Sequence, residues 1–348
     1  MNARVFSVLA SATVSCFLLL PSQDRAAAAD LQYRNPTLAV PLRAEPVTVD
    51  GTIDEQEWQD ASLLTGFMNA YFLSEEHADR KLYFLSPWQN RVWAKSDGKN
   101  LYVAFRLNRR RGGELRATVA PEVRDSNLTR DDSFELFIMP NARDNYCLSL
   151  NSRGAIMDAH KDDTSSQARD YAWDGNWTCR TSITGEAWSG EISIPLSELA
   201  DSMPTPGTRW KIGLGRMNWE AGLRSGWSFL YGMYQKSETY GTLVFTRNLA
   251  VRLTDRGRLS RQRAGLALTF FNGGTAAETV TVASTLAPVE ERGSNTISLL
   301  DYRRGLAGEA QQYSLGTMQE AKETVTVPPG ETEEIVRMLP LDFGRSAL

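Results

Sequence analysis

The chain has 348 residues, 42% of them hydrophobic, and a formal net charge of −4. A chain of this length usually forms one large domain or two ordinary ones. Its weakly acidic balance gives no electrostatic reason to expect a nucleic-acid partner. The chain has only two histidines, and they are not in a metal-ligand spacing. This scarcity disfavours a histidine-based hydrolase, a zinc site and a bis-histidine haem.

Residues 1–29 are typical of a cleaved export signal. Arg4 gives the segment a positive start, an apolar stretch covers 5–20, and the alanines at 26–29 supply a cleavage site. The apolar stretch is short for a membrane span, and no later stretch approaches about 18 apolar residues. We therefore expect a secreted, periplasmic or cell-surface bacterial protein without a transmembrane span after cleavage. An uncleaved N-terminal anchor helix is the alternative.

A polar lead over 30–44 precedes a succession of short β-like segments. Asp50-Gly51 predicts a turn after the first strand, and 54–61 predicts two helical turns that begin at Asp54. One further helical turn is expected at 195–199, opened by Pro195. The other predicted strands are 90–94, 101–107, 133–139, 146–150, 155–159, 177–183, 187–194, 210–217 and 242–245. Many short strands separated by turns indicate a sandwich or a barrel.

The composition changes near residue 248. All nine tryptophans lie between Trp58 and Trp227, and a charged run follows at 252–263. We expect a linker at 248–263. Beyond it, further strand-like segments and strong turn signals, such as Asn272-Gly273-Gly274, predict a smaller immunoglobulin-like β-sandwich over 264–348.

Three segments carry a family resemblance. They are 49–61 (VDGTIDEQEWQDA), 131–138 (DDSFELFI) and 188–196 (WSGEISIPL). In this order and spacing they resemble the family 9 carbohydrate-binding modules. The resemblance covers 45–247 and implies an all-β, antiparallel β-sandwich that binds an oligosaccharide or polysaccharide without catalysis.

The resemblance also implies positions for a sugar site. Such modules hold a sugar between aromatic rings, with polar side chains on its hydroxyls. Tyr234 occupies one of the aromatic positions, and Glu135 occupies the acidic position of the D-D-S-x-E strand. Arg216 falls where the family often places a polar side chain that faces the ligand.

Two positions depart from the family pattern. The second aromatic position falls at Thr129, and the position of a sugar-binding arginine falls near Ser149. Trp219, Trp173 and Trp227 are therefore candidates for the missing aromatic platform, and we include the first two in the predicted site. The alternative for each tryptophan is core packing.

Calcium is a further association of the family. Asp125, Asp131 and Asp132 form an oxygen-rich loop that is suited to this ion, with an ordinary solvated loop as the alternative. No other cofactor is expected. Cys147 and Cys179 lie in strand-like segments, and they either form a disulfide or remain as two buried thiols.

Three other classes compete with sugar binding. A haem domain would need an axial pair that no spacing supports. A glycoside hydrolase would need two acids around a cleft, but Asp132 and Glu135 stand three apart on a strand and face opposite sides. A structural protein of the cell envelope that has lost its sugar site is the main alternative, because of Thr129 and Ser149.

Overall fold

The structure is a computed structural model. It describes residues 7–8, 36–70, 86, 88–219, 222–228, 234–235, 237–255, 263–286, 314–315, 319–340 and 343–344. Apart from residues 7–8, the predicted export signal lies outside the described residues. No helix within the described ranges is long and apolar enough to span a membrane.

The regular secondary structure of the described residues is almost entirely β, as predicted. Its strands are β1 (Ser7–Val8), β2 (Thr37–Pro41), β3 (Ser62–Thr65), β4 (Met68–Ala70), β5 (Asn90–Ser96), β6 (Asn100–Asn108), β7 (Ser133–Met139), β8 (Asp144–Asn151), β9 (Ile156–Asp162), β10 (Thr178–Ile183), β11 (Ala187–Pro195), β12 (Arg209–Asn218), β13 (Leu223–Gly226), β14 (Gly241–Thr246), β15 (Leu249–Asp255), β16 (Arg263–Asn272), β17 (Glu278–Leu286), β18 (Ser314–Leu315), β19 (Gln319–Val327), β20 (Thr332–Pro340) and β21 (Phe343–Gly344). Two short 3₁₀ turns, η2 (Leu196–Glu198) and η3 (Ser237–Thr239), interrupt them.

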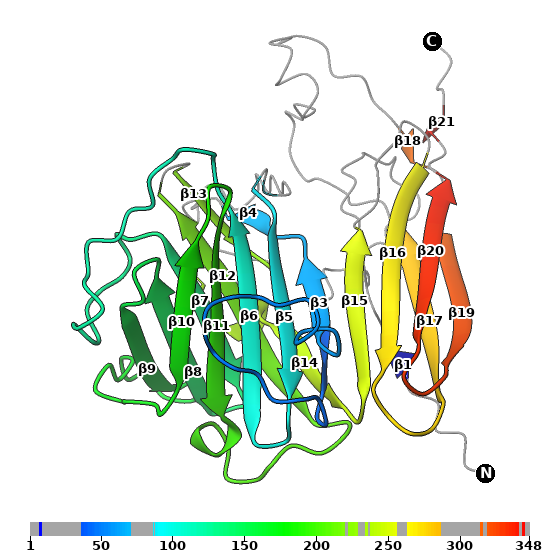
Figure 1. Ribbon diagram of the computed structural model, residues 1–348, viewed down its shortest axis with the longest axis horizontal. Helices are drawn as coiled ribbons and strands as arrows, with labels where there is room; N and C mark the ends of the chain where they lie inside the picture. Colours follow the sequence, from blue (N-terminus) through cyan, green and yellow to red (C-terminus); the bar gives the residue numbers. More distant parts are fainter. Residues whose placement is uncertain are drawn as a thin grey trace.

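Two sheets form the larger sandwich (Figure 1). The first sheet has the order β10-β11-β6-β5-β3-β15-β16-β20, and the second has the order β2-β14-β12-β7-β8-β9, with β13 and β4 attached beside β12. Most neighbours are antiparallel, as predicted. The β14–β2 and β15–β3 pairs are parallel, so the sheets are mixed rather than purely antiparallel.

The core of this sandwich comes from alternate residues of both sheets. Phe105 on β6 stacks on Phe134 on β7 across the gap between the sheets, with ring centroids 4.3 Å apart. Trp188 on β11 meets Phe105 edge-on at 5.3 Å. All three side chains are fully buried, and each contributes roughly 1.5–3 kcal/mol or more of hydrophobic stabilisation.

The first motif, 49–61, packs on the outside of the first sheet. Asp54 Oδ1 accepts hydrogen bonds from the backbone N–H groups of Gln56 and Glu57, as expected for an N-cap. The predicted helical turns are a run of turns instead, with Trp58 buried beneath them. The Trp58 indole N–H donates to Glu191 of β11 at 2.8 Å. Motif residues from two distant segments therefore hold one another in place.

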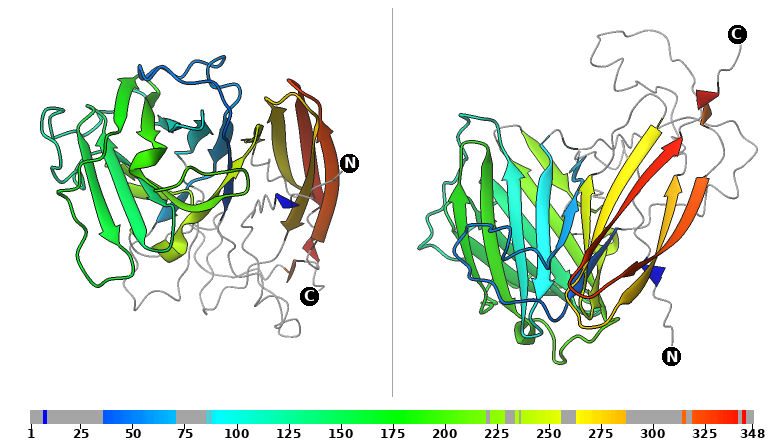
Figure 2. Two further views of the ribbon diagram at one scale, coloured as in Figure 1. Left: turned by 90° about the horizontal axis from the view of Figure 1, so that it is seen from below. Right: turned by 45° about the vertical axis from the view of Figure 1, so that its right-hand side comes forward.

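The C-terminal strands form a second, smaller pair of layers (Figure 2). β16 and β20 extend the first sheet, and the β17–β19 pair lies against them. Their core contains Leu249, Leu268, Phe270, Val280 and Val327.

Part of the predicted linker at 248–263 is a strand. Residues 249–255 form β15, which joins β3 of the larger sandwich to β16 of the smaller one. Val251 and Leu253 pack against the core of the smaller sandwich. The burial of these apolar side chains favours a strand in this charged segment.

Candidate functional site

The candidate site lies on the outer face of the second sheet, the face turned away from the first sheet. Alternate residues of β7 point into the core, so Glu135 and Phe137 point outward. On β8, Ser149 pairs with Glu135 and Cys147 pairs with Phe137. On β12, Gly215 pairs with Glu135. Glu135 is therefore at the centre of this face, between two strands that present small residues.

Two tyrosines cover the glycines of β12. Tyr234 lies so close to Gly215 that a Cβ there would be 2.9 Å from its ring, and Tyr240 lies equally close to Gly213. Tyr234 is 8% exposed, and its hydroxyl donates to the backbone oxygen of Arg216 at 2.6 Å. The Tyr234 ring is thus packed on the sheet beside Glu135, and it is not an exposed platform.

Glu135 is partly buried, and burial raises the pKa of its carboxyl to about 7. The positive charge of Arg224 on β13 acts in the opposite direction, as do the Ser133 hydroxyl and the Arg169 charge. Near neutral pH this carboxyl therefore exists in both protonation states. It is able to donate or accept a hydrogen bond.

Arg169 lies over the same face, carried by the segment that follows β9. It is 9% exposed, and its Nη1 donates to the backbone oxygen of Asn145 at 3.2 Å. Its guanidinium carbon is 5.8 Å from the centroid of the Phe137 ring. Among the described residues, Arg169 Nε, Arg169 Nη2, Asn145 Oδ1 and Tyr240 Oη are buried polar atoms without a hydrogen-bond partner.

Trp219 lies just beyond the end of β12 and is half-buried. Asp132 fixes its backbone, because Oδ1 accepts from the Trp219 N–H at 2.9 Å and Oδ2 accepts from the Arg116 N–H at 2.6 Å. The Arg116 guanidinium carbon is 5.1 Å from the centroid of the Trp219 ring. This cation–π contact and the two hydrogen bonds hold the ring at one end of the sheet.

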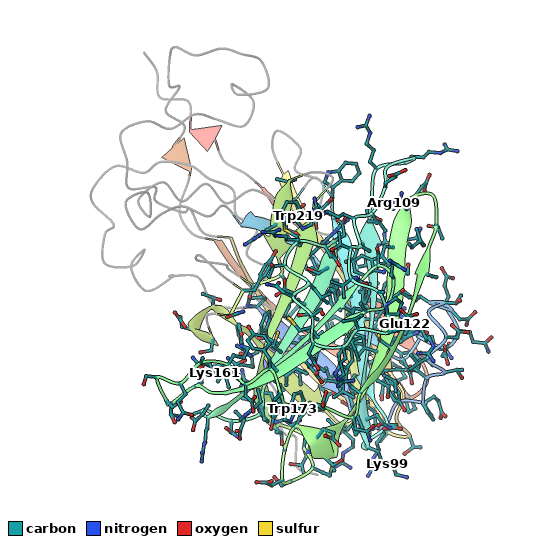
Figure 3. All side chains as sticks on the ribbon, turned by 90° about the vertical axis from the view of Figure 1, so that its left-hand side faces the viewer. Lys99, Arg109, Glu122, Lys161, Trp173 and Trp219 are labelled. Carbon is teal, nitrogen blue, oxygen red and sulfur yellow. The ribbon has the colours of Figure 1, made fainter. Side chains whose placement is uncertain are left out.

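Arg216 and Trp173 lie away from this face. Arg216 points into the sandwich, where its Nη1 donates to Asn90 Oδ1 of β5 at 2.6 Å. The Trp173 ring packs against Tyr146, with centroids 5.0 Å apart. Figure 3 shows Trp173 and Trp219 well apart, toward opposite ends of the larger sandwich. The structure therefore brings Glu135 and Tyr234 together, and it does not gather all five predicted ligand residues.

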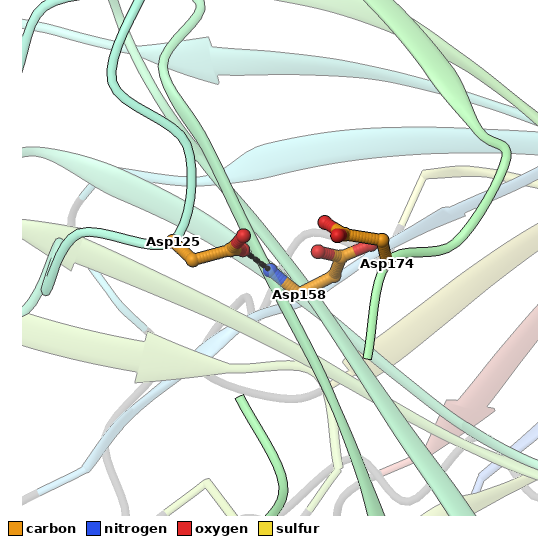
Figure 4. Close-up of side chains that lie close together, drawn as sticks. All are labelled: Asp125, Asp158 and Asp174. Atoms are coloured by element: carbon orange, nitrogen blue, oxygen red, sulfur yellow. Dashed lines mark hydrogen bonds between the residues drawn. The ribbon is translucent and has the colours of Figure 1, made fainter. Parts of the chain in front are cut away.

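Three aspartates meet near the start of β9. Carboxylate oxygens of Asp125, Asp158 and Asp174 lie within 4.8 Å of one another (Figure 4). The Arg124 guanidinium contacts all three, at 2.8 Å from Asp158, 2.5 Å from Asp174 and 3.6 Å from Asp125. Arg124 thus offsets part of the negative charge of this cluster.

Asp131 and Asp132, the other two predicted calcium ligands, lie outside that cluster. Asp131 Oδ1 accepts from the Thr118 hydroxyl at 2.6 Å, and Oδ2 accepts from the Asn151 amide at 2.8 Å. Burial acts to raise the pKa of Asp131, but these hydrogen bonds outweigh it and lower the pKa. Both aspartates organise neighbouring loops through hydrogen bonds.

The two cysteines are free, so the disulfide alternative is corrected. Cys179 lies in the core between the sheets, whereas Cys147 is on the outer side of the second sheet. A sheet separates the two side chains, which prevents bonding. Burial raises the pKa of the Cys147 thiol to about 12 and that of Cys179 to about 11.

Sequence reasoning missed Arg169, Arg224 and Asn145. Arg169 belongs to a polar loop, 163–170, whose composition is that of a solvated turn. Nothing in its spacing indicates that the loop folds back over the sheet. The sequence showed the Tyr240-Gly241 pair, but it assigned no function to Tyr240.

Comparison with known proteins gives partial likenesses only. No family model matches the chain, and no curated protein matches it. Among solved structures, a candidate carbohydrate-binding protein from Bacteroides uniformis aligns with TM-score 0.48 and 15% identity, over 61% of this chain and 99% of its own. A family 9 carbohydrate-binding module from Caldicellulosiruptor kristjanssonii, in complex with glucose, aligns with TM-score 0.41 and 14% identity, over 61% and 96%. A cellotriose complex of such a module from that organism gives 0.41 and 13%, over 61% and 94%. At these values the likenesses assign no function to this chain.

Proposed function

We propose that this is an exported, non-catalytic carbohydrate-binding protein whose ligand lies on the outer face of the second sheet. The supporting observation is the make-up of that face. It combines the partly buried Glu135 carboxyl, the half-buried Arg224 and, at the end of β12, the half-buried Trp219 ring.

This combination suits a sugar. Aromatic faces pack against the C–H faces of a sugar ring, while its hydroxyls need placed polar partners. Trp219 is four residues along β12 from Gly215, the partner of Glu135. At roughly 3.3 Å per residue, the two groups are about 13 Å apart. An oligosaccharide is long enough to contact both, and the motif resemblance independently favours this ligand class.

A glycan array followed by calorimetry tests the proposal. Trp219→Ala is expected to weaken binding by roughly 1–2 kcal/mol, as for a single aromatic contact residue. Trp173→Ala is the matched variant, because Trp173 is also half-buried but lies toward the opposite end of the larger sandwich. Equal losses of glycan affinity in both variants would show that the binding site is not on the outer face of the second sheet. Absence of binding to any glycan would contradict the proposal.

Non-catalytic action is part of the proposal. Hydrolysis of a glycosidic bond needs two carboxyl groups that face each other around the scissile bond. Glu135 points outward, while both oxygens of Asp132 accept backbone hydrogen bonds. We expect no release of reducing sugar from any glycan that binds, and measurable release would make the protein an enzyme.

Calcium is not required in this proposal, because the Arg124 guanidinium already contacts all three aspartates and offsets part of their negative charge. A chelator is therefore expected to leave both the melting temperature and sugar affinity unchanged. Arg124→Gln should create the calcium dependence that the native chain lacks, since three carboxylates would then face one another without a cation. A melting temperature of the native protein that rises with added calcium would contradict this expectation.

Export rests on the sequence of residues 1–29. The expected mature N-terminus follows Ala29, in the periplasm or outside the cell. Fractionation followed by N-terminal sequencing measures both, and an intact Met1 in the cytoplasmic fraction would contradict export.

The second candidate function is a structural role in the cell envelope. It is favoured by the burial of Tyr234 and Tyr240, the aromatic rings nearest to Glu135. This function predicts a stable protein that binds no glycan and whose Trp219→Ala variant has no binding phenotype.

A further inference from the structure

Arg169 is a buried cation without a carboxylate partner among the described residues. It is 9% exposed, and among the described residues its hydrogen bond goes to the Asn145 backbone oxygen and its ring contact is with Phe137. No acidic oxygen in the described part of the chain lies within salt-bridge distance of it. Leaving such a charge uncompensated is costly, so its position calls for a partner.

The two unpartnered nitrogens of Arg169 are Nε and Nη2. Their N–H bonds lie on one edge of the planar guanidinium and point in the same direction. This edge forms two parallel hydrogen bonds to a carboxylate, in the bidentate arrangement that makes arginine a carboxylate receptor. The third nitrogen, Nη1, is held by Asn145 and fixes the orientation of the fork.

Two further buried oxygens beside Arg169 have no hydrogen-bond partner within the described part of the chain. Asn145 Oδ1 is an acceptor on the residue whose backbone holds Arg169, and Tyr240 Oη belongs to a ring 5.6 Å from Phe137. Burial raises the pKa of the Tyr240 phenol, while the Arg169 charge and the Asn145 amide act against it, which places the three groups together. Together, Arg169 offers two N–H groups that can bind a carboxylate, Asn145 offers an acceptor oxygen, and Tyr240 offers a hydroxyl.

Asp163, the acidic residue hydrogen-bonded to the Asn145 side chain, is already paired. Asp163 accepts from Ser237, from Lys161 at 3.2 Å and from the Asn145 amide nitrogen at 3.4 Å. Glu135 belongs to the same face, but it has no salt bridge to Arg169. Within the described residues no carboxylate is hydrogen-bonded to Arg169 Nε or Nη2, so this edge of the guanidinium favours an anionic group of a ligand.

We propose that the sugar recognised on the outer face of the second sheet is an acidic saccharide, and that Arg169 receives its carboxylate. Asn145 Oδ1 accepts from a neighbouring sugar hydroxyl, and Tyr240 Oη completes the contact with the carboxylate. A uronic acid has the required carboxylate and hydroxyl on one ring. This inference rests on the proposed function and names the ligand class of that same site.

The first experiment separates the contribution of the carboxylate to binding from that of the sugar ring. The full chain is titrated by calorimetry with trigalacturonate, with its methyl ester, with a glucuronate oligosaccharide, with cellotriose and with acetate. We expect at least about tenfold tighter binding of one uronate oligomer than of its neutral counterparts, the gain of one bidentate arginine–carboxylate pair. Equal affinity for neutral and acidic sugars overturns the inference and leaves the proposed function intact. No binding of any sugar overturns both, and equal binding of acetate overturns the saccharide assignment.

The second experiment assigns the effect to Arg169. Arg169→Gln should abolish the tenfold preference for the uronate, and Arg169→Lys should retain a smaller part of it, because lysine keeps the charge but not the fork. Arg153→Gln removes an exposed arginine between β8 and β9 and should leave the preference unchanged.

A stability readout accompanies these titrations. Without ligand, Arg169→Gln should melt no lower than the native protein, since it loses one backbone contact together with an uncompensated charge. A large drop in melting temperature would show a purely structural role for Arg169. A uronate preference that survives the substitution would also overturn the assignment.

Discussion

Glu135 shows how the environment of one residue makes stability depend on pH. Its carboxyl has a pKa of about 7 in the folded protein, against an ordinary value of 4.5. As pH rises from 4.5 to 7, the unfolded chain loses this proton before the folded protein does. Stability therefore falls across that window, and the full penalty is present above pH 7.

Glu135→Gln should remove this penalty. The expected gain in the free energy of unfolding is at most about 3 kcal/mol at pH 8, and close to zero at pH 4. Denaturant unfolding at the two pH values measures it. A gain of equal size at both would show that ionisation of Glu135 is not its cause.

A second residue-scale prediction concerns the glycines of β12. Gly215→Ala would place a Cβ 2.9 Å from the Tyr234 ring, which must then shift. Overpacking of this kind lowers the free energy of unfolding by about 1–3 kcal/mol. It should also move the Tyr234 ring away from Glu135. Gly185→Ala is the control, because nothing lies within 4 Å of its added Cβ. Equal melting temperatures for the two variants would contradict this packing.

Two of the three segments that carry the resemblance, 49–61 and 188–196, support each other structurally. Glu191 Oε2 accepts from the backbone N–H groups of Gly51 at 2.9 Å and Asp50 at 3.0 Å, while Oε1 accepts from the Trp58 indole. The motif residues can thus persist without the ligand site. This explains why these segments predict the sandwich.

Glu191→Gln tests this support. The amide nitrogen would replace one accepting oxygen and face a donor, so at least one hydrogen bond is lost. We expect a loss of about 2–3 kcal/mol in the free energy of unfolding. Glu186→Gln, an exposed position before β11, should have no measurable effect. A neutral Glu191→Gln would show that the 49–61 segment is held by packing alone.

What the sequence predicts at this scale follows from local chemistry. The Asp54 cap and the turn after Pro195 were predictable because neighbouring residues determine them. The alternation of inward-facing and outward-facing side chains along β7 was also predictable from the sequence. The inward direction of Arg216 depends on its pairing with Phe134, an inward-facing residue, and such a register is not local. The fold-back of Arg169 is equally non-local.

At the scale of the whole molecule, β15 links the two sandwiches. Arg252 on this strand donates to the backbone oxygens of Ala61 at 3.0 Å and Trp58 at 2.5 Å, so it also secures the first motif. Because the first sheet runs from β10 to β20 without a break, the two cores should unfold together.

Arg252→Gln is expected to lower the free energy of unfolding by about 1–3 kcal/mol, the value of a charge-assisted hydrogen bond. The native protein should show a single calorimetric transition. Arg209→Gln, at an exposed arginine of β12, serves as the control. Two separate transitions in the native protein would show that the sandwiches are independent domains, as the predicted linker implied.

The two free thiols give the molecule a pair of natural probes for its own opening. A buried thiol with a raised pKa reacts with alkylating reagents only when its surroundings open. Cys147 lies with Tyr234 and Tyr240, so its alkylation rate reports exposure of the outer face. Cys179 lies between the sheets, so its rate reports separation of the sandwich. Ligand that slows Cys147 alone would mark the occupied face without any engineered label.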